Sequence, residues 1–197
     1  MTAPSPLVAP VTMVGSVIRL EPYAPALREE LRAALDCDSA AWDLFSRSGH
    51  GVHFDQWWAD LTAGLRAGTW IPFAVRRLDG AIVGTTSFLN IRADRQVVEI
   101  GATFYRPEVR GTAVNPEAKL LMLEHAFGGG ARRVELVTDA RNLRSRAAIK
   151  KLGAVEEGTL RRDRVIWTGH VRDSVMFSVT DLDWPTVRSR LLTRLGR

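Results

Sequence analysis

The chain has 197 residues, a formal net charge of +5 and a single cysteine. This length suffices for one domain with a substantial core, and the apolar content of 46% and charged content of 25% are ordinary for a globular protein. One cysteine excludes an internal disulfide framework, and no apolar run approaches the roughly 18 residues of a membrane span or forms a signal peptide. We therefore expect a flexible N-terminal tail over residues 1–13, one domain over residues 14–197, and a cytoplasmic location without membrane partners.

Periodic apolar residues predict a succession of strands and helices after this tail. Strands are expected over residues 14–20, 70–78, 81–90, 97–104, 133–138, 154–160 and 171–179, and helices over residues 24–35, 54–66, 116–127, 143–152 and 182–195. Asp79-Gly80 joins two of these strands and is a strong hairpin signal. This order predicts an α/β (α+β) fold, with a mixed, mostly antiparallel sheet of about seven strands and helices on both faces.

The segment Arg110-Gly-Thr-Ala-Val-Asn115 connects the fourth predicted strand to the third predicted helix. A loop that enters a helix in this way points successive backbone N–H groups into one concavity at the positive helix end, which suits a pyrophosphate. Gly111 and Ala113 leave room for close approach, and Arg110 and Lys119 add positive charge. Plain strand-to-helix turns have the same form, so this segment alone leaves both interpretations open.

A second motif lies in the next predicted helix, where Asn142-x-x-Ser145-x-x-x-Ile149 leads into Lys-Leu-Gly153. Asn142, Ser145 and Ile149 fall on one helical stripe, and Gly153 is typical of a helix end. Together with the loop at residues 110–115, this motif resembles the GNAT superfamily of N-acetyltransferases. The resemblance is strongest to the branch that includes bacterial ribosomal-protein N-terminal acetyltransferases, and it covers roughly residues 14–180.

The resemblance implies a single-domain GNAT-like fold that takes acetyl-CoA as cosubstrate and no metal. In the family the first loop holds the pyrophosphate, and the second motif lines the pantetheine arm and the thiol. This chain departs from the family pattern where glycines are common, at Ala113 and Asn115, and where many members carry a tyrosine acid, at Ile149, so that acid is excluded there. The resemblance predicts as cofactor-binding residues Thr103, Phe104, Tyr105, Arg110, Gly111, Thr112, Ala113, Val114, Asn115, Lys119, Asn142 and Arg146.

Acetyl transfer from a thioester to an amine requires a neutral amine, donors for the oxyanion and protonation of the departing thiolate. Glu99, in the strand that feeds the loop, is the predicted base; its alternative is a structural Glu that pairs with an Arg or caps a loop. Backbone N–H groups near Phe104 and Tyr105 are the candidates for the oxyanion. Ser145 is the predicted partner of the thiolate, and its alternative is a hydrogen bond to its own helix backbone.

Trp42 and Phe45 lie in the region where helices of the family form one wall of the acceptor cleft. They are predicted to touch substrate, with a purely structural role in the core as the alternative. The sequence leaves the amine open: a protein N-terminal amine, an amino sugar, an amino acid and a polyamine all fit. A CoA-binding protein without turnover is a further alternative, as is a nucleic-acid binder that uses the basic residues between 132 and 172, although no nucleic-acid motif is present. The family resemblance also implies a homodimer.

Overall fold

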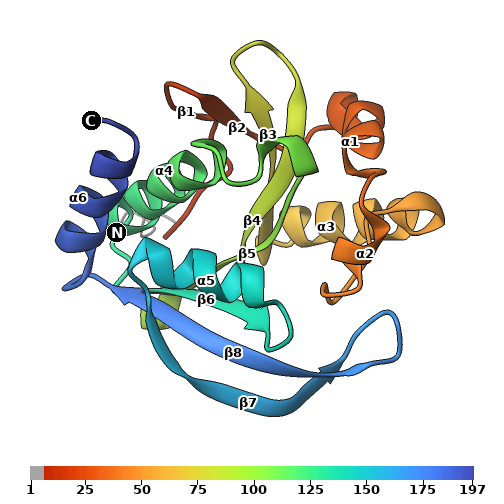
Figure 1. Cartoon of the computed structure of the whole chain (residues 1–197). Coiled ribbons are helices and arrows are strands. Elements are labelled where there is room, and N and C mark those ends of the chain that lie inside the picture. The colour runs from red at the N-terminus through yellow and green to blue at the C-terminus, as the bar shows by residue number, and fades with distance from the viewer. Residues whose placement is uncertain (1–6) are drawn as a thin grey trace, which may run out of the picture.

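The computed structural model describes residues 7–197 and contains one eight-stranded sheet in the order β1-β2-β3-β4-β5-β6-β8-β7 (Figure 1). Among these strands β5 and β6 run parallel, and all other neighbours are antiparallel. The predicted mixed, mostly antiparallel sheet is confirmed, with β1 as an additional strand too short to give a periodic pattern. The strands are β1 (Met13–Val14), β2 (Ile18–Pro22), β3 (Trp70–Arg77), β4 (Ile82–Arg92), β5 (Val97–Tyr105), β6 (Arg133–Asp139), β7 (Val155–Val165) and β8 (Val171–Thr180).

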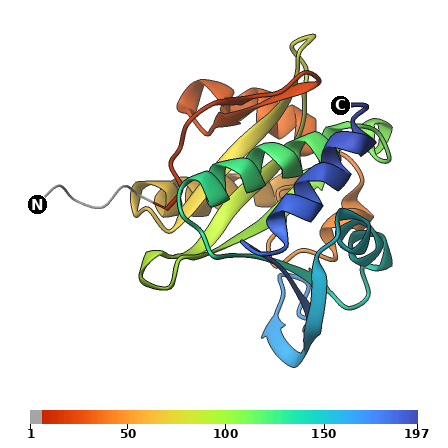
Figure 2. The ribbon, with the colours of Figure 1, turned by 90° about the vertical axis from the view of Figure 1, so that its left-hand side faces the viewer.

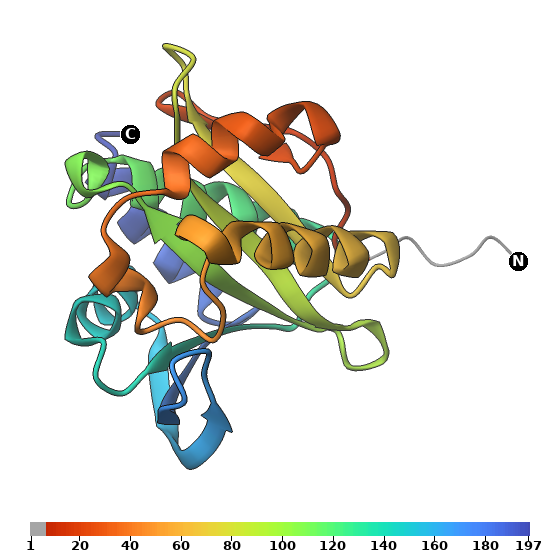
Figure 3. The same cartoon turned by 90° about the vertical axis from the view of Figure 1, so that its right-hand side faces the viewer.

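The helices cover both faces of this sheet, as predicted. Helices α1 and α3 lie across one face (Figure 3), and α4 and α6 lie across the other (Figure 2). Short turns of 3-10 helix connect several elements. The helices are α1 (Arg28–Leu35), α2 (Ser39–Trp42), α3 (Phe54–Arg66), α4 (Val114–Gly128), α5 (Leu143–Leu152) and α6 (Trp184–Arg194), and the 3-10 turns are η1 (Pro25–Leu27), η2 (Gly51–His53), η3 (Ala93–Arg95) and η4 (Pro107–Val109).

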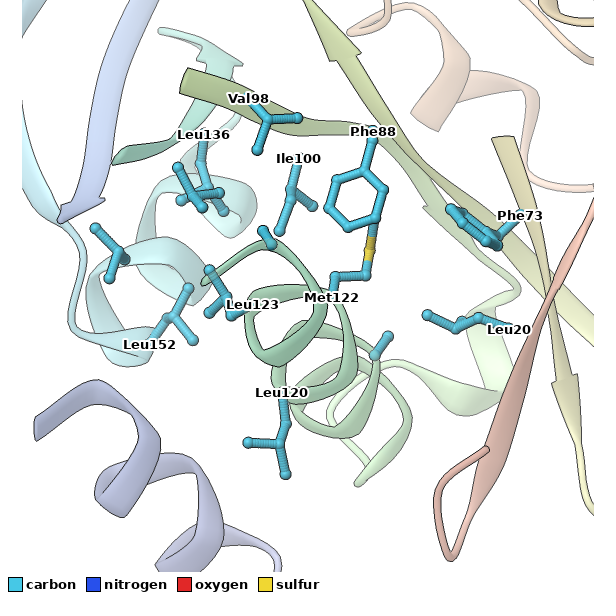
Figure 4. Packing of buried hydrophobic residues seen from close by; sticks show 14 of the residues in the cluster. Leu20, Phe73, Phe88, Val98, Ile100, Leu120, Met122, Leu123, Leu136 and Leu152 are labelled. Atoms are coloured by element: carbon cyan, nitrogen blue, oxygen red, sulfur yellow. The ribbon is translucent and has the colours of Figure 1, made fainter. Parts of the chain in front are cut away.

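Each face of the sheet has its own hydrophobic cluster. On the α4 side, Met122 and Leu123 of the helix pack against Phe88, Val98 and Ile100 of the strands (Figure 4). On the opposite side an aromatic cluster joins α1, α2 and α3 to β5 through residues that include Trp42, Phe54, Trp57 and Phe104. Burial of large apolar side chains on both faces contributes most of the stabilisation of such a layered fold.

The N-terminal segment of the described chain packs onto the α4 side. Leu7 and Val8 are buried in that cluster, and the backbone N–H of Ala9 donates to His125 Nε2 at 3.0 Å. The packed chain therefore extends back to Leu7, which corrects the predicted flexible tail over residues 7–13. Residues 1–6 of that predicted tail lie outside the described residues.

Glu117 fixes the first turn of α4 to the turn between β1 and β2. Its buried carboxylate accepts hydrogen bonds from the backbone N–H groups of Ser16 at 2.9 Å, Val17 at 2.6 Å and Ile18 at 2.8 Å. The Arg197 side chain also donates to it. These contacts hold the N-terminal end of α4 in a defined place on the sheet, and that end forms part of the site described below.

The sheet opens between its two parallel strands. β5 and β6 pair only where Val97–Glu99 lie opposite Arg133–Glu135. Beyond that point β5 continues along β4 to Tyr105, whereas β6 follows β8 to Asp139. The β4 to β5 register shifts in the same region, and Ala102 has a positive φ of 48°, so an irregularity in β5 accompanies the separation. The result is a V-shaped gap in the middle of the sheet.

Candidate active site

A cavity of about 640 Å³ occupies the gap between β5 and β6 and reaches both faces of the sheet. Its walls come from β5, β6, α2, α5, the start of α4 and the β7–β8 hairpin. Of the residues predicted from the sequence, most line it, while Thr112, Ala113, Val114 and Arg146 do not. Those in the lining are Trp42, Phe45, Glu99, Thr103, Phe104, Tyr105, Arg110, Gly111, Asn115, Lys119, Asn142 and Ser145.

The loop before α4 has the form of an anion site. Gly111 has a φ of +80°, and an added Cβ there would meet no atom within 4 Å, so the position faces open space. No side chain caps α4, because the residue at its N-cap is Ala113. The first-turn N–H groups and the positive end of the helix dipole are therefore available to a phosphate.

Two of the predicted loop residues shape the loop instead of lining the cavity. Thr112 Oγ1 donates to the Val109 carbonyl at 2.7 Å and accepts from the Val114 N–H at 3.3 Å. The Val114 side chain is buried in the core. These residues and Ala113 are corrections to the predicted contact set as far as their side chains are concerned, because a helix entry offers a ligand mainly its backbone.

Arg110 lines the cavity, but its charge already has a partner. Its Nη1 donates to Asp38, its Nε donates to the Tyr105 carbonyl at 2.8 Å, and its guanidinium lies 5.5 Å from the centre of the Phe104 ring. The ion pair lowers the pKa of Asp38. Arg146, a further predicted ligand, turns away to Glu156 at 3.6 Å. Neither guanidinium is therefore free for phosphate in this arrangement.

Lys119 supplies the buried positive group on the α4 side of the cavity. Only 7% of the residue is exposed, and its Nζ donates to Thr103 Oγ1 at 3.1 Å. Burial lowers the pKa of Lys119 to about 7. Within residues 7–197 no carboxylate forms an ion pair with this amine, so an anionic cofactor would supply the missing countercharge.

Asn142 and Ser145 meet the cavity at the start of α5. The Asn142 Oδ1 caps the helix by accepting from the Ser145 N–H at 3.0 Å, which leaves the amide nitrogen of Asn142 to a ligand. Ser145 is half-buried, and its Oγ has no hydrogen-bond partner among residues 7–197. The alternative role for Ser145, a bond from its hydroxyl to its own helix backbone, is therefore not the one observed.

Glu99 stands at the last paired position of β5, where the gap begins. The residue is 8% exposed, and its Oε2 accepts from Asn90 Nδ2 at 2.7 Å. Burial raises the pKa of this carboxyl, and the Asn90 hydrogen bond opposes the shift. The structural alternative of an Arg ion pair is not formed, since the contact is to an amide. A buried carboxyl with a raised pKa is suited to general base catalysis near neutral pH.

Trp42 and Phe45 combine the two predicted roles. Trp42 is 1% exposed and stacks on Phe104 with ring centres 4.5 Å apart, which is the geometry of a core aromatic. Phe45 lies on the other side of Trp42 at 4.8 Å and is only partly buried. Both also line the cavity, so the aromatic core doubles as the wall of the acceptor side.

Three polar residues in the cavity lining were not predicted from the sequence. They are Asn90 of β4, Arg164 of β7 and Arg172 of β8. None belongs to a motif, and each reaches the site only through strand pairing. The one signal in the sequence is Arg172 itself, which interrupts a strand whose other members are mostly apolar or small.

Residues 18–155 match the family model described as an acetyltransferase (GNAT) domain, and this match spans more than half of the chain. The chain belongs to the GNAT family of acetyltransferases. A GCN5-related N-acetyltransferase from Brucella melitensis superposes with a TM-score of 0.87 at 26% identity, covering 96% of this chain and 87% of that chain. For a candidate acetyltransferase from T. thermophilus the values are 0.84, 32%, 95% and 98%. No curated protein matches the sequence.

Mycobacterium smegmatis RimJ, solved in complex with CoA-disulfide, has the same fold, with a TM-score of 0.79 at 22% identity over 95% of this chain and 96% of that chain. As a GNAT member the chain is an acetyl-CoA-dependent N-acetyltransferase, which confirms the predicted cosubstrate. Within residues 7–197 no cluster of three His, Cys, Asp or Glu side chains could hold a metal ion. The same residues form no helix long and apolar enough to cross a membrane.

Proposed function

We propose that this GNAT enzyme transfers the acetyl group to a primary amine by direct attack, with acetyl-CoA and the amine bound together. The observation that carries the proposal is the position of Glu99, buried at the apex of the gap between β5 and β6. From there its carboxylate faces the acceptor side, while the start of α4 lies on the cofactor side. The two substrates would therefore meet beside a base.

In this mechanism Glu99 takes a proton from the acceptor ammonium, and the neutral nitrogen attacks the thioester carbonyl. Backbone N–H groups of β5 beyond Glu99, which have no β6 partner, support the developing oxyanion. The C–S bond then breaks, and Ser145 Oγ donates a hydrogen bond to the departing thiolate. A covalent acyl-enzyme is not needed, because the amine itself is the nucleophile.

The acceptor in this proposal is a small-molecule amine in preference to a protein N-terminus. The tip of the β7–β8 hairpin packs onto the α2 region, where Trp167 Nε1 donates to the Trp42 carbonyl at 2.9 Å and Arg172 reaches Ser46 Oγ at 3.4 Å. These contacts close one side of the acceptor cleft. The likeness to RimJ supports the fold alone, so the N-terminal alternative rests on the sequence resemblance.

Calorimetry and a thiol assay together test the proposal. Acetyl-CoA should bind the purified chain, and an amine panel should include at least one compound that releases free CoA thiol. The panel should contain amino acids, amino sugars, polyamines and short peptides with free N-termini. Binding of acetyl-CoA without thiol release on any amine would contradict transfer to amines and favour the CoA-binding alternative. Release with peptides alone would contradict the small-molecule acceptor.

A further inference from the structure

Two arginines face the acceptor side of the cavity from neighbouring strands. Arg164 of β7 and Arg172 of β8 are paired directly across the antiparallel ladder, and both line the cavity. Like charges at directly opposed positions of a sheet destabilise it. A pair of this kind beside a cavity indicates a ligand that compensates the charge.

Arg172 lacks a counterion in the protein. It is 6% exposed, its Nε is buried without a hydrogen-bond partner, and its one side-chain contact is the long bond to Ser46 Oγ at 3.4 Å. Among residues 7–197 no carboxylate lies within 4 Å of its guanidinium. Burial lowers the pKa of Arg172, which reflects the cost of keeping this charge out of water.

The carboxylates nearest to Arg172 are each engaged by another group. Asp163 binds Arg164 Nε at 2.7 Å and Ser174 Oγ at 2.7 Å, and Asp139 binds Arg141 Nη2 at 2.8 Å. Glu99 accepts from Asn90. Arg172 is therefore not explained as the structural counterion of any one of these groups.

Strand register places Arg172 on the same face of the sheet as Glu99. Glu99 lies opposite Glu135, and Glu135 lies opposite Ser178. Ser178 and Arg172 are six residues apart on β8, and side chains at even spacing share a face. Glu99 and Arg172 also influence each other's pKa, although they are not in contact. A molecule on this face can therefore meet both.

We infer that Arg172, assisted by Arg164 at the rim, binds an anionic group of the acceptor, so that the substrate is a small amine that carries a carboxylate or a phosphate. This inference rests on the proposed transfer to a small amine. Guanidinium binds both anions through paired N–H donors, which fixes orientation as well as position. Because Arg172 is buried, the anion must enter the cavity, and this favours a small molecule over the flank of a peptide.

A binding experiment tests the anion site without turnover. The CoA-loaded chain is titrated by calorimetry with N-acetylglycine and, separately, with N-acetylglycinamide, which differ in the carboxylate. A parallel pair, 2-acetamidoethyl phosphate and N-acetylethanolamine, tests the phosphate. We expect at least one anion to bind about 10- to 100-fold more tightly than its neutral partner, and Arg172→Gln to abolish this difference. Arg172→Lys should restore part of it.

Arg161→Gln is the matched control, because Arg161 is an exposed arginine of β7 outside the cavity lining. It removes the same charge and should leave the preference intact. Equal binding of the anionic and neutral partners, or an equal loss in the Arg161 and Arg172 variants, would overturn the inference. Acetyl-CoA affinity should not change in either variant, which separates a lost anion site from a misfolded protein.

Turnover then separates this inference from the proposed function. Glycine is compared with glycinamide, and 2-aminoethyl phosphate with ethanolamine, in the thiol assay. We expect the anionic members to be acetylated, and Arg172→Gln to raise their KM about 10- to 100-fold with little change in kcat. Acetylation of neutral amines or acidic peptides in preference would overturn the inference alone. Retained anion binding with no amine acetylated would instead refute the proposed transfer.

Discussion

Glu99 carries the proton transfer in this mechanism. Glu99→Gln should lower turnover by about 10²- to 10⁴-fold, the usual contribution of a general base, and leave acetyl-CoA affinity nearly unchanged. Because burial raises the pKa of Glu99, the acidic limb of the rate profile should lie above the value of roughly 4.3 for an ordinary glutamate, and the variant should lose that limb. Steady-state kinetics across pH measure both effects.

Glu135→Gln provides the control for this substitution. Glu135 lies directly opposite Glu99 on β6, but it is paired with Arg92 and with Arg133. Its replacement removes a carboxylate from the same layer without touching the proposed base, so the acidic limb should persist. Parental turnover of the Glu99 variant at every pH would show that solvent or another residue removes the proton.

Ser145 should matter less than Glu99. Ser145→Ala removes a hydroxyl that has no other partner among residues 7–197, but water can protonate a thiolate whose ordinary thiol pKa is only about 8.5. We expect a smaller loss of turnover and slightly weaker cofactor binding, both measured with the same thiol assay and calorimetry. An alanine variant slower than Glu99→Gln would reverse the order of importance of the two residues.

Lys119 should make cofactor binding depend on pH. Its pKa in the free protein is about 7, and a bound phosphate would raise it. Below pH 7 the amine is already charged, so binding is tightest there. Between about 7 and the higher pKa of the complex, binding must take up a proton, and affinity falls by up to about tenfold per pH unit. Calorimetry with acetyl-CoA across this window measures the slope.

Lys119→Met separates this slope from the titration of the cofactor's own phosphates. The variant retains an apolar side chain of similar length, so it should bind acetyl-CoA more weakly at low pH and lose most of the dependence above pH 7. An identical slope in parent and variant would remove Lys119 from the cofactor site.

At the scale of elements, the loop before α4 should tolerate size better than negative charge. Gly111 has a positive φ, which Asn and Asp adopt more readily than other residues with side chains. Gly111→Asp and Gly111→Asn are therefore matched in shape and strain. The Asp variant should bind acetyl-CoA about 10- to 100-fold more weakly than the Asn variant, because its charge would lie beside the phosphates. Equal affinities in calorimetry would show that the phosphates bind elsewhere.

Most elements were predictable because their signals are local. The helix at Leu143–Leu152 was predicted at both bounds, since Asn142 caps it and Gly153 ends it with a positive φ. The hairpin at Asp79-Gly80 also formed where predicted. β7 runs to Val165, five residues beyond the predicted end, because its pairing with β8 sets its length and its own sequence is largely polar.

The site itself was only partly predictable. Loop and helix motifs located the cofactor side, where Gly111, Asn115, Lys119 and Ser145 line the cavity. The acceptor side was not accessible in this way, because Asn90 and Arg172 approach Glu99 through the pairing of distant strands. The same limit applies to Arg110, whose motif predicts a phosphate ligand but whose actual partner, Asp38, lies 72 residues away.

At the scale of the whole molecule, Glu117 should stabilise the fold through its three backbone contacts. Burial alone would raise the pKa of Glu117, but the backbone donors of Ser16, Ile18 and Val17 together outweigh it and lower the pKa. Glu117→Gln should reduce the free energy of unfolding by about 1–3 kcal/mol at neutral pH. Because the folded-state pKa is depressed, this contribution is present above the unfolded pKa of roughly 4.3 and is lost as the pH falls through the folded value.

Urea unfolding of the parent and the Glu117 variant measures this difference. The two curves should differ at neutral pH and converge in acid. Glu124→Gln is a suitable control, because Glu124 lies on the same helix and makes only a surface ion pair with Arg188. A constant difference between parent and Glu117→Gln at all pH values would show that packing, and not the carboxylate charge, is what the substitution removes.

The central claim is that the gap between β5 and β6 brings the thioester to Glu99. A crystal structure of the chain with bound acetyl-CoA tests it most directly. The account predicts the pyrophosphate on the N–H groups at the start of α4, the pantetheine arm between β5 and β6 beside Asn142, and the acetyl carbon on the Glu99 side of the gap. A cofactor bound outside this gap, or one whose acetyl group points away from Glu99, would contradict the account.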